Sequence, residues 1–261
     1  MEKSILPSLS QLAHIWQETL KWQPTSEQQE KFERLYRLIL EGNRQLNLTR
    51  ITEPQEFWEK HLWDSLRGLA PILSAEEIQQ SQENSQTSTQ TSATRIIDIG
   101  TGAGFPGIPA AIVISDCMVT LVDSTHKKVT FINNIIPHLE LANVETIASR
   151  IEEIGQNNQY REVYDIATLR AVAAGSACAE YALPLLKKGG LGIIYRGNWT
   201  KEEHIDLEKA VKILGGTIEC VERFTTPLSK SIRHCLYLRK IGPTPMKFPR
   251  PAGVPTHKAI A

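Results

Sequence analysis

The stretch IIDIGTGAGFPGIPAAI, residues 96–112, decides the fold. It begins as an apolar segment typical of a buried strand, passes through glycines at positions 100, 102 and 104, and continues as an apolar segment typical of a helix. Glycine has no side chain, so the backbone can turn sharply there and approach a ligand closely. The stretch therefore predicts a strand, a ligand-binding turn and a helix, the first unit of an α/β sheet.

The chain after this turn supports that interpretation. Short segments of β type alternate with segments of helical type from residue 95 to about residue 214, which favours a parallel sheet with helices on both faces. Two further segments, residues 217–227 and 231–240, have strand character and are joined by a loop. We expect a doubly wound, seven-stranded, mostly parallel sheet with these two segments as an antiparallel hairpin at one edge.

Composition divides the chain into four predicted parts. Residues 1–73 have helical periodicity and form an N-terminal helical extension. Residues 74–94 are nearly all Gln, Ser, Thr and Glu, and we predict a disordered linker there because they can bury little apolar surface. The sheet domain occupies residues 95–240, and residues 241–261 form a basic, proline-rich tail.

The N-terminal part carries signals for individual helices. Thr25 or Ser26 can cap one helix, and Pro54 suits the first turn of another that we expect to stop before Pro71. The segment NRQLNLTRI, residues 43–51, is too polar and rich in asparagine for a core helix. We predict a structured loop there.

Composition also limits the class of protein. The chain has 261 residues, 41% of them hydrophobic, and no apolar run near the roughly 18 residues of a membrane span, so we expect a cytoplasmic protein with no membrane partner. Four scattered cysteines and no suitable histidine spacing predict no metal site. No heptad pattern is present, so a monomer is the expectation. From Arg223 onward there are eight basic residues and no acidic one, a pattern that suits either a solvated tail or contacts with phosphates.

The spacing around the glycine turn distinguishes between cofactors. A dinucleotide motif needs a glycine at position 105, where Phe105 stands, whereas the observed pattern is G-x-G-x-G preceded by Asp98. Asp123 ends the next predicted strand, 23 residues after Gly100, where a carboxylate can bind both hydroxyls of a ribose. An adenosine-containing cofactor is indicated. S-adenosylmethionine (SAM) fits this pattern better than NAD, because SAM has no pyrophosphate for the turn to hold.

Seven segments along the chain point to one family: NLTRI (47–51), KHLWDSL (60–66), DIGTGAGFPGIP (98–109), LVDSTHKKVTFI (121–132), SRIEEI (149–154), LRAVA (169–173) and KFPRPAGVP (247–255). In this order they resemble the signatures of the RsmG family, formerly called GidB, of bacterial 16S rRNA methyltransferases. The resemblance implies a Rossmann-like class I SAM-dependent methyltransferase fold with a small helical cap. It also implies SAM as cofactor and methyl transfer to N7 of guanine 527, in the 530 loop of 16S rRNA. The partner would be the RNA itself or an assembling small ribosomal subunit.

The resemblance also implies positions for the cofactor. The implied contacts are Gly100 and Phe105 on the glycine turn, Asp123, Ser124 and Thr125 at the ribose, Ile151 and Glu152 beside the adenine, and Arg170 as an arginine lining the pocket. Two features depart from the family: Ala103 stands where the family usually has proline, and the 74–94 segment is longer than is typical.

The chemistry explains why no general base is expected. Guanine N7 has an in-plane lone pair and no proton, so the enzyme's task is placement, and Arg170 is interpreted as a positioning residue. The basic residues Arg239, Lys240, Lys247 and Arg250 are predicted to hold RNA phosphates. His61 and Asp64 are predicted to brace the N-terminal helices against the sheet domain, with an RNA contact as the alternative.

Two other functions stay open at this point. One is a SAM-dependent methyltransferase that acts on another RNA, a protein or a small molecule. The other is a nucleotide-sensing or redox-linked module that binds NAD or FAD through the same turn.

Overall fold

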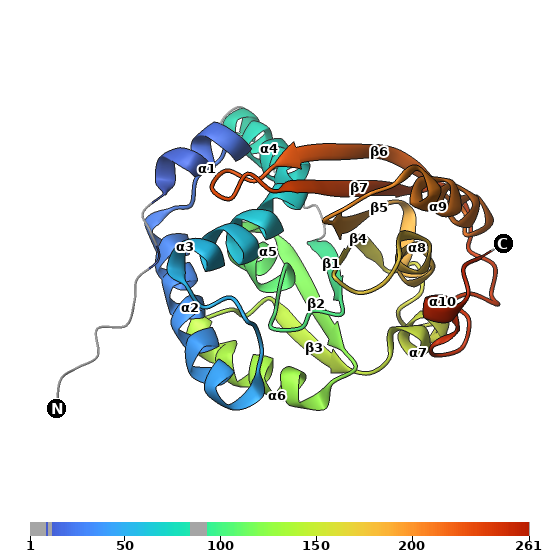
Figure 1. The fold of residues 1–261 in the computed structure, drawn as a ribbon, viewed down its shortest axis with the longest axis horizontal. Helices are drawn as coiled ribbons and strands as arrows, with labels where there is room; N and C mark the ends of the chain where they lie inside the picture. Colours follow the sequence, from blue (N-terminus) through green and yellow to red (C-terminus); the bar gives the residue numbers. More distant parts are fainter. Residues whose placement is uncertain (1–8, 10–11, 84–92, 261) are drawn as a thin grey trace.

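A seven-stranded sheet lies between two layers of helices in the computed structural model, which describes residues 9, 12–83 and 93–260 (Figure 1). The strand order is β3-β2-β1-β4-β5-β7-β6, and only β7 runs antiparallel to its neighbours. The predicted doubly wound sheet with an antiparallel edge hairpin is thus confirmed. The strands are β1 (Thr94–Ile99), β2 (Cys117–Asp123), β3 (Val144–Ala148), β4 (Tyr164–Arg170), β5 (Leu186–Arg196), β6 (Gly216–Thr225) and β7 (Ile232–Lys240).

The helices come from every part of the chain. Those that precede the sheet are α1 (Ala13–Leu20), α2 (Ser26–Leu46), α3 (Pro54–Phe57), the π-helix η1 (Trp58–Trp63) and α4 (Asp64–Glu83). Those within and after the sheet are α5 (Gly107–Val113), α6 (His126–Ile135), the 3-10 helix η2 (Pro137–Leu139), α7 (Ile151–Gln156), α8 (Gly175–Ala182), α9 (Lys201–Ile213) and α10 (Val254–His257).

The order of the strands determines where a ligand can bind. The chain leaves β1 toward β2 and β3 and then returns to β4 on the other side of β1, so the strand order reverses between β1 and β4. In open α/β sheets, ligands occupy the crevice outside the carboxyl ends of the strands at such a reversal. Gly100 directly follows β1 and Arg170 ends β4, so both lie at this crevice.

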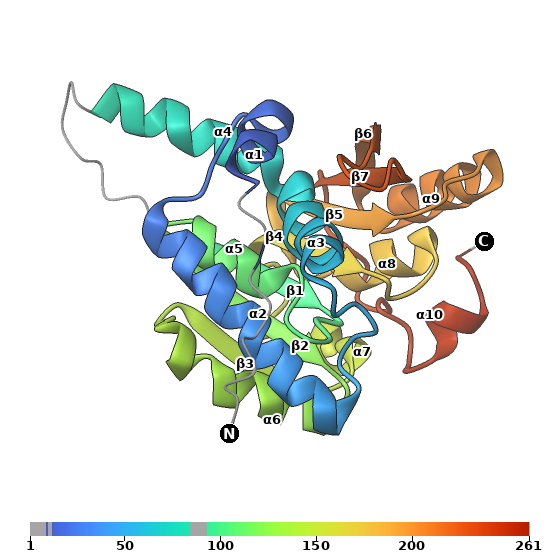
Figure 2. The same ribbon diagram turned by 60° about the vertical axis from the view of Figure 1, so that its left-hand side comes forward.

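Alternating residues of the central strands supply two hydrophobic cores. Ile96 of β1 packs with the N-terminal helices, α5 and α6, whereas Ile97 and Ile99 pack with α7, α8 and α9. Figure 2 shows α2 and α5 on one side of the sheet and α8 and α9 on the other. Because helices cover both faces, the inner strands are apolar on both faces, which is the pattern seen in the sequence. The N-terminal helices share the first core with the sheet.

Helix α2 begins as predicted and ends later than predicted. The Thr25 side chain accepts a hydrogen bond from the backbone of Gln28, and the Gln28 side chain accepts one from the backbone of Thr25, which is a capping box. The predicted 43–51 loop was wrong in its first four residues, because α2 continues to Leu46 and Asn47 closes it with a φ of 47°. Asparagine tolerates this left-handed conformation, so it marks the true end of the helix.

The predicted stop before Pro71 was also wrong. Helices α3, η1 and α4 follow one another without a break from Pro54, and Pro71 lies inside α4. A proline inside a helix costs roughly 3 kcal/mol. Leu69 and Leu73 on either side of it are both fully buried, and burying a leucine stabilises by about 1.5–3 kcal/mol each, enough to offset that cost.

The predicted linker begins within a helix. Residues 74–83 continue α4, whereas residues 84–92 lie outside the described residues. Alanine, glutamate and glutamine favour helix, and extending an existing helix needs no new nucleus, so a polar composition does not prevent the extension. No helix in the described part of the chain is both long enough and apolar enough to span a membrane.

Candidate functional site

The glycine turn after β1 adopts a conformation that only glycine accepts easily. Gly100, Gly102 and Gly104 have φ values of 69°, 61° and 98°. The turn is held from beneath by Asp98, which is fully buried: one carboxylate oxygen accepts from the backbone N–H of Gly107 at 2.9 Å and the other from the Thr168 hydroxyl at 2.9 Å. Burial raises the pKa of Asp98, and these hydrogen bonds oppose that shift.

Two cavities adjoin this turn, and Gly100 lines both of them. The first, of about 280 Å³, lies beside the end of β2 and is called here the β2 cavity. The second, of about 420 Å³, lies against η1 and the start of α4 and is called here the helical cavity. A molecule that passes the turn at Gly100 can therefore occupy both.

Asp123 is one of two acidic side chains that line the β2 cavity. Its Oδ2 accepts from the backbone N–H of Gly102 at 3.0 Å, and its Oδ1 accepts from the backbone N–H of Thr125 at 2.8 Å. A carboxylate oxygen can accept two hydrogen bonds, so Oδ1 retains a position for a hydroxyl donor. Lys128 Nζ lies 3.6 Å from Oδ2.

The structure brings together most of the residues predicted to contact a cofactor. Thr125 lines neither cavity, and its backbone instead orients Asp123. Glu152 is buried, and its Oε1 accepts from the Tyr181 hydroxyl at 3.1 Å and from the backbone N–H of Gly253 at 3.0 Å. The β2 cavity is lined by Gly100, Asp123, Ser124, Ile151 and Glu152, and the helical cavity by Gly100, Phe105 and Arg170.

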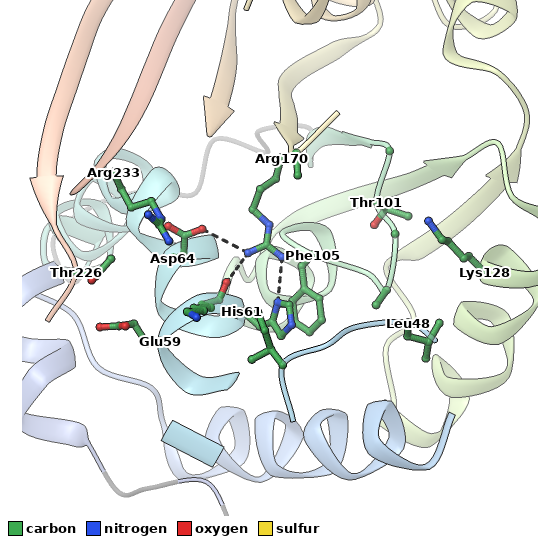
Figure 3. Close-up of a pocket in the computed structure, with 16 residues that line it drawn as sticks. Leu48, Glu59, His61, Asp64, Thr101, Phe105, Lys128, Arg170, Thr226 and Arg233 are labelled. Carbon is green, nitrogen blue, oxygen red and sulfur yellow. Dashed lines mark hydrogen bonds and ion pairs between the residues drawn. The ribbon is translucent and has the colours of Figure 1, made fainter. Parts of the chain in front are cut away.

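Arg170 is held by the N-terminal helices (Figure 3). One terminal nitrogen of its guanidinium donates to the carbonyl of Lys60 at 2.6 Å and lies 3.4 Å from Asp64 Oδ2, while the other lies 3.2 Å from His61 Nδ1. These three partners belong to η1 and the first residue of α4. π-helical turns are frequently found at functional sites, and here one faces the cavity. The predicted brace between the N-terminal helices and the sheet domain is confirmed.

The ring of His61 fits this site as a neutral imidazole. Arginine only donates, so Nδ1 accepts from Arg170 and Nε2 carries the proton that faces the Thr49 hydroxyl, 2.8 Å away. The ring stacks on Phe105 with centroids 4.5 Å apart and an angle of 13°. Burial, and then the positive charges of Arg170 and Lys60, lower the pKa of His61 to about 3.

This lowered pKa predicts a pH dependence of stability. Between pH 6.5 and pH 3 the unfolded chain binds a proton at position 61 that the folded protein does not, so stability is expected to fall as the pH decreases through this range. The loss from His61 between pH 7 and pH 5 is on the order of 2 kcal/mol. Urea unfolding of the unmodified protein and of His61→Asn at both pH values measures it. The variant lacks the titrating ring, so an equal loss in both proteins would contradict the prediction.

Two of the residues predicted to bind RNA lie away from both cavities. Because β7 runs antiparallel, Arg239 and Lys240 lie at the amino-terminal edge of the parallel strands, opposite the two cavities. Arg239 pairs with Glu219, and the ammonium of Lys240 is buried and donates to the carbonyl of Leu183 at 2.8 Å. Burial lowers the pKa of Lys240 to about 8. A buried ammonium at the far edge cannot contact a phosphate near the site.

The other two lie in the C-terminal tail. Arg250 is bound in two places to Glu180, whose side chain has no exposure, with Nη2 at 2.7 Å from Oε2 and Nε at 2.9 Å from Oε1. Its guanidinium therefore binds a group of the protein itself and not an RNA phosphate. Lys247 is exposed, with its ammonium 5.2 Å from the centroid of the Phe248 ring, and remains available to a partner.

Sequence reasoning missed several residues that line the cavities. Thr226 directly follows β6 and Arg233 lies near the start of β7, and no motif marks them. Gly253, Thr256 and His257 come from the tail, where the segment KFPRPAGVP was recognised but was assigned to RNA. Within the described ranges, no group of three or more His, Cys, Asp or Glu side chains is arranged to hold a metal ion.

Comparison with known proteins adds an independent observation. Residues 28–234, which include the glycine turn, Asp123, Glu152 and Arg170, match the family described as "GidB: rRNA small subunit methyltransferase G". The chain belongs to the GidB family. Its resemblance to this family, inferred from seven short segments, is thereby confirmed.

GidB relatives match nearly the whole chain. The Ribosomal RNA small subunit methyltransferase G of Nostoc punctiforme is 62% identical over 252 residues, which cover 97% of this chain and 98% of that protein. The protein of the same name from Trichodesmium erythraeum is 54% identical over 260 residues, which cover 100% of this chain and 98% of that protein. Among solved structures, M. jannaschii TYW2 in complex with AdoMet superposes with a TM-score of 0.46 and 16% identity, over 65% of this chain and 77% of that chain.

Proposed function

We propose that this protein transfers the methyl group of SAM to N7 of guanine 527 in the 530 loop of 16S rRNA. The observation that carries the proposal is the meeting of two cavities at Gly100. A methyl donor in the β2 cavity can present its reactive end, past the glycine turn, to an acceptor in the helical cavity. Membership of the GidB family supports the class of reaction and the ribosomal substrate.

The residues of the β2 cavity suit the adenosine part of SAM. The two hydroxyls of a ribose are hydrogen-bond donors, and Asp123 faces the cavity as a carboxylate acceptor. Ile99, Val122 and Ile151 supply an apolar lining that suits a flat purine ring. The backbone at Gly100 is bare of side-chain atoms, which leaves room for the methionine part to cross the turn.

The chain's own contribution to the reaction is placement. SAM, when bound, supplies a methyl group on a sulfonium, and the N7 lone pair forms the new N–C bond while the C–S electron pair returns to sulfur. Guanine N7 carries no proton, so no side chain has to remove one. Arg170, His61 and Phe105 form a rigid surface that can orient the base, since each is packed or hydrogen-bonded to another. Correct orientation of two reactants can contribute roughly 7–11 kcal/mol in favourable cases.

The RNA has to deliver an unpaired or distorted guanine. In a regular RNA duplex N7 faces a deep and narrow major groove that protein side chains cannot reach. A paired guanine therefore cannot be placed in the helical cavity. Three cations at the helical cavity are suited to hold the flanking phosphates, in place of Arg239, Lys240 and Arg250. They are Lys128 and Arg233, which line the cavity, and Arg50, which lies exposed between the lining residues Leu48 and Ile51.

The product tests the proposal directly. Labelled SAM is incubated with the protein and with unmethylated 16S rRNA, small subunits or assembly intermediates, and N7-methylguanine is mapped by borohydride and aniline cleavage. Cleavage at guanine 527 is the expected result. A methyl group found at another position would contradict the assignment to guanine 527. Thermal stabilisation by NAD rather than by S-adenosylhomocysteine would overturn the class of function.

Arg233 is expected to contribute to RNA binding. Arg233→Gln removes one cation at the cavity opening, so RNA affinity is expected to fall at low salt, and the slope of log affinity against log salt is expected to decrease by about 1. Affinity for S-adenosylhomocysteine should stay the same. Arg239→Gln is the matched control, because it changes the same strand at the opposite edge. Equal effects of the two variants on RNA affinity would contradict the prediction.

A further inference from the structure

The C-terminal segment of residues 247–257, called here the C-terminal strap, lies beside the β2 cavity. Its last turn, α10, is preceded by Gly253, and Gly253, Thr256 and His257 line the cavity together with Ile151, Glu152 and Tyr181. In Figure 1 the strap is the red segment next to α7 and α8. The cavity thus has one wall from the sheet domain and another from the end of the chain.

The first half of the strap is fixed firmly to α7 and α8 and the segment between β3 and β4. Gln156 donates to the carbonyl of Pro249 at 2.6 Å, and Arg161 donates to the carbonyl of Phe248 at 2.7 Å. Phe248 is buried in the second core, and Arg250 is paired with Glu180 of α8. The strap therefore has a fixed position up to Arg250.

The second half of the strap is held by a residue that lines the β2 cavity. The backbone N–H of Gly253 donates to Glu152 Oε1 at 3.0 Å, the same oxygen that accepts from Tyr181. Gly253 has a φ of 82°, so the turn that directs α10 toward the cavity requires glycine at this position. Glu152 thus joins the lining of the cavity to the strap through one hydrogen bond.

We infer that the C-terminal strap is part of the cofactor site: α10 closes the β2 cavity over the adenosine of SAM, and adenosine binding and strap docking stabilise each other. This inference rests on the proposed placement of SAM. A ligand that contacts both walls binds the docked strap more tightly than the undocked one, so it shifts the equilibrium toward docking. The inference assigns Gly253, Thr256 and His257 of this segment to the cofactor. Lys247 stays a candidate for an RNA contact.

Hydrogen exchange of the unmodified full-length protein gives the first test. Adding S-adenosylhomocysteine is expected to slow amide exchange in peptides that cover residues 251–258, as well as in those that cover the glycine turn. Slower exchange at the glycine turn with unchanged exchange in the strap would overturn the inference.

A single substitution gives the second test. Gly253→Pro removes the N–H that Glu152 accepts and cannot adopt the required φ, so affinity for S-adenosylhomocysteine is expected to weaken about tenfold. Lys247→Ala, an exposed residue of the same strap, is the matched control and should bind normally. A Gly253→Pro variant that binds as tightly as the unmodified protein would overturn the inference.

A third variant separates this inference from the proposed function. Asp123→Ala is expected to lose affinity for S-adenosylhomocysteine whether or not the strap takes part. If Asp123→Ala weakens binding and Gly253→Pro does not, only the inference about the strap fails. If Asp123→Ala also binds normally, the cofactor does not occupy the β2 cavity, and both fail.

Discussion

Replacing Arg170 with alanine is expected to lower kcat/KM for the RNA about a hundredfold. The guanidinium holds η1 and α4 against the end of β4 through Lys60, His61 and Asp64, and its central carbon lies 5.6 Å from the centroid of the Phe105 ring. Without it, the surface proposed to orient the acceptor loses its common partner. A displacement of about 1 Å at a reacting centre can reduce a rate by roughly 10²-fold.

The measurement combines methyl transfer with cofactor binding. Arg170 lines the helical cavity and not the β2 cavity, so affinity for S-adenosylhomocysteine is expected to fall much less than kcat/KM. Arg170→Lys is the second variant. It keeps the charge but lacks the planar group that reaches several partners at once, so it should recover little activity. Full activity of Arg170→Lys would show that charge alone is required.

Replacing Arg250 with alanine is expected to destabilise the protein by about 3–5 kcal/mol. The Glu180 carboxylate has no exposure, and Arg250 is bound to both of its oxygens. Removing one partner of a buried ion pair leaves the other charge uncompensated in a medium of low polarity. The effect should therefore appear as lost folding stability, without a change in the salt dependence of RNA binding.

Urea unfolding of three variants tests this expectation. Arg250→Ala should be strongly destabilised, whereas Lys247→Ala should match the unmodified protein, because Lys247 is exposed in the same segment. The double variant Arg250→Ala with Glu180→Ala removes the unpaired charge and should recover part of the lost stability. A loss below about 1 kcal/mol in Arg250→Ala would mean that the pair contributes as little as a typical surface pair.

The sequence was most informative where local physics decides the outcome. The glycine turn, the helix cap at Thr25 or Ser26 and the alternation of strands and helices all depend on neighbouring residues, and the structure agrees with each of them, with Thr25 as the cap. The end of the helix predicted from Pro54 was wrong because burial of Leu69 and Leu73 offsets the cost of Pro71. That burial depends on how the core packs, and sequence periodicity does not predict which residues become fully buried.

The same difference between local and long-range effects applies to the candidate site. Asp123 ends β2 and Glu152 comes shortly after β3. The two strands end at one edge of the sheet, so topology brings these residues together once the motif is recognised. Arg239 and Lys240 were misplaced because a charge count along the chain ignores strand direction, and β7 carries them to the opposite edge. Arg250 was misassigned because its partner, Glu180, lies 70 residues away in the sequence.

The position of Gly100 between the two cavities has a consequence for how this enzyme can evolve. A Cβ at this position would lie 2.8 Å from the Val172 side chain, and the same backbone borders both the β2 cavity and the helical cavity. A change there alters both cavities together, and with them the proposed places of the methyl donor and the acceptor. Selection for a new acceptor therefore has to proceed through the helices and the β6–β7 loop, while the glycine turn stays as it is.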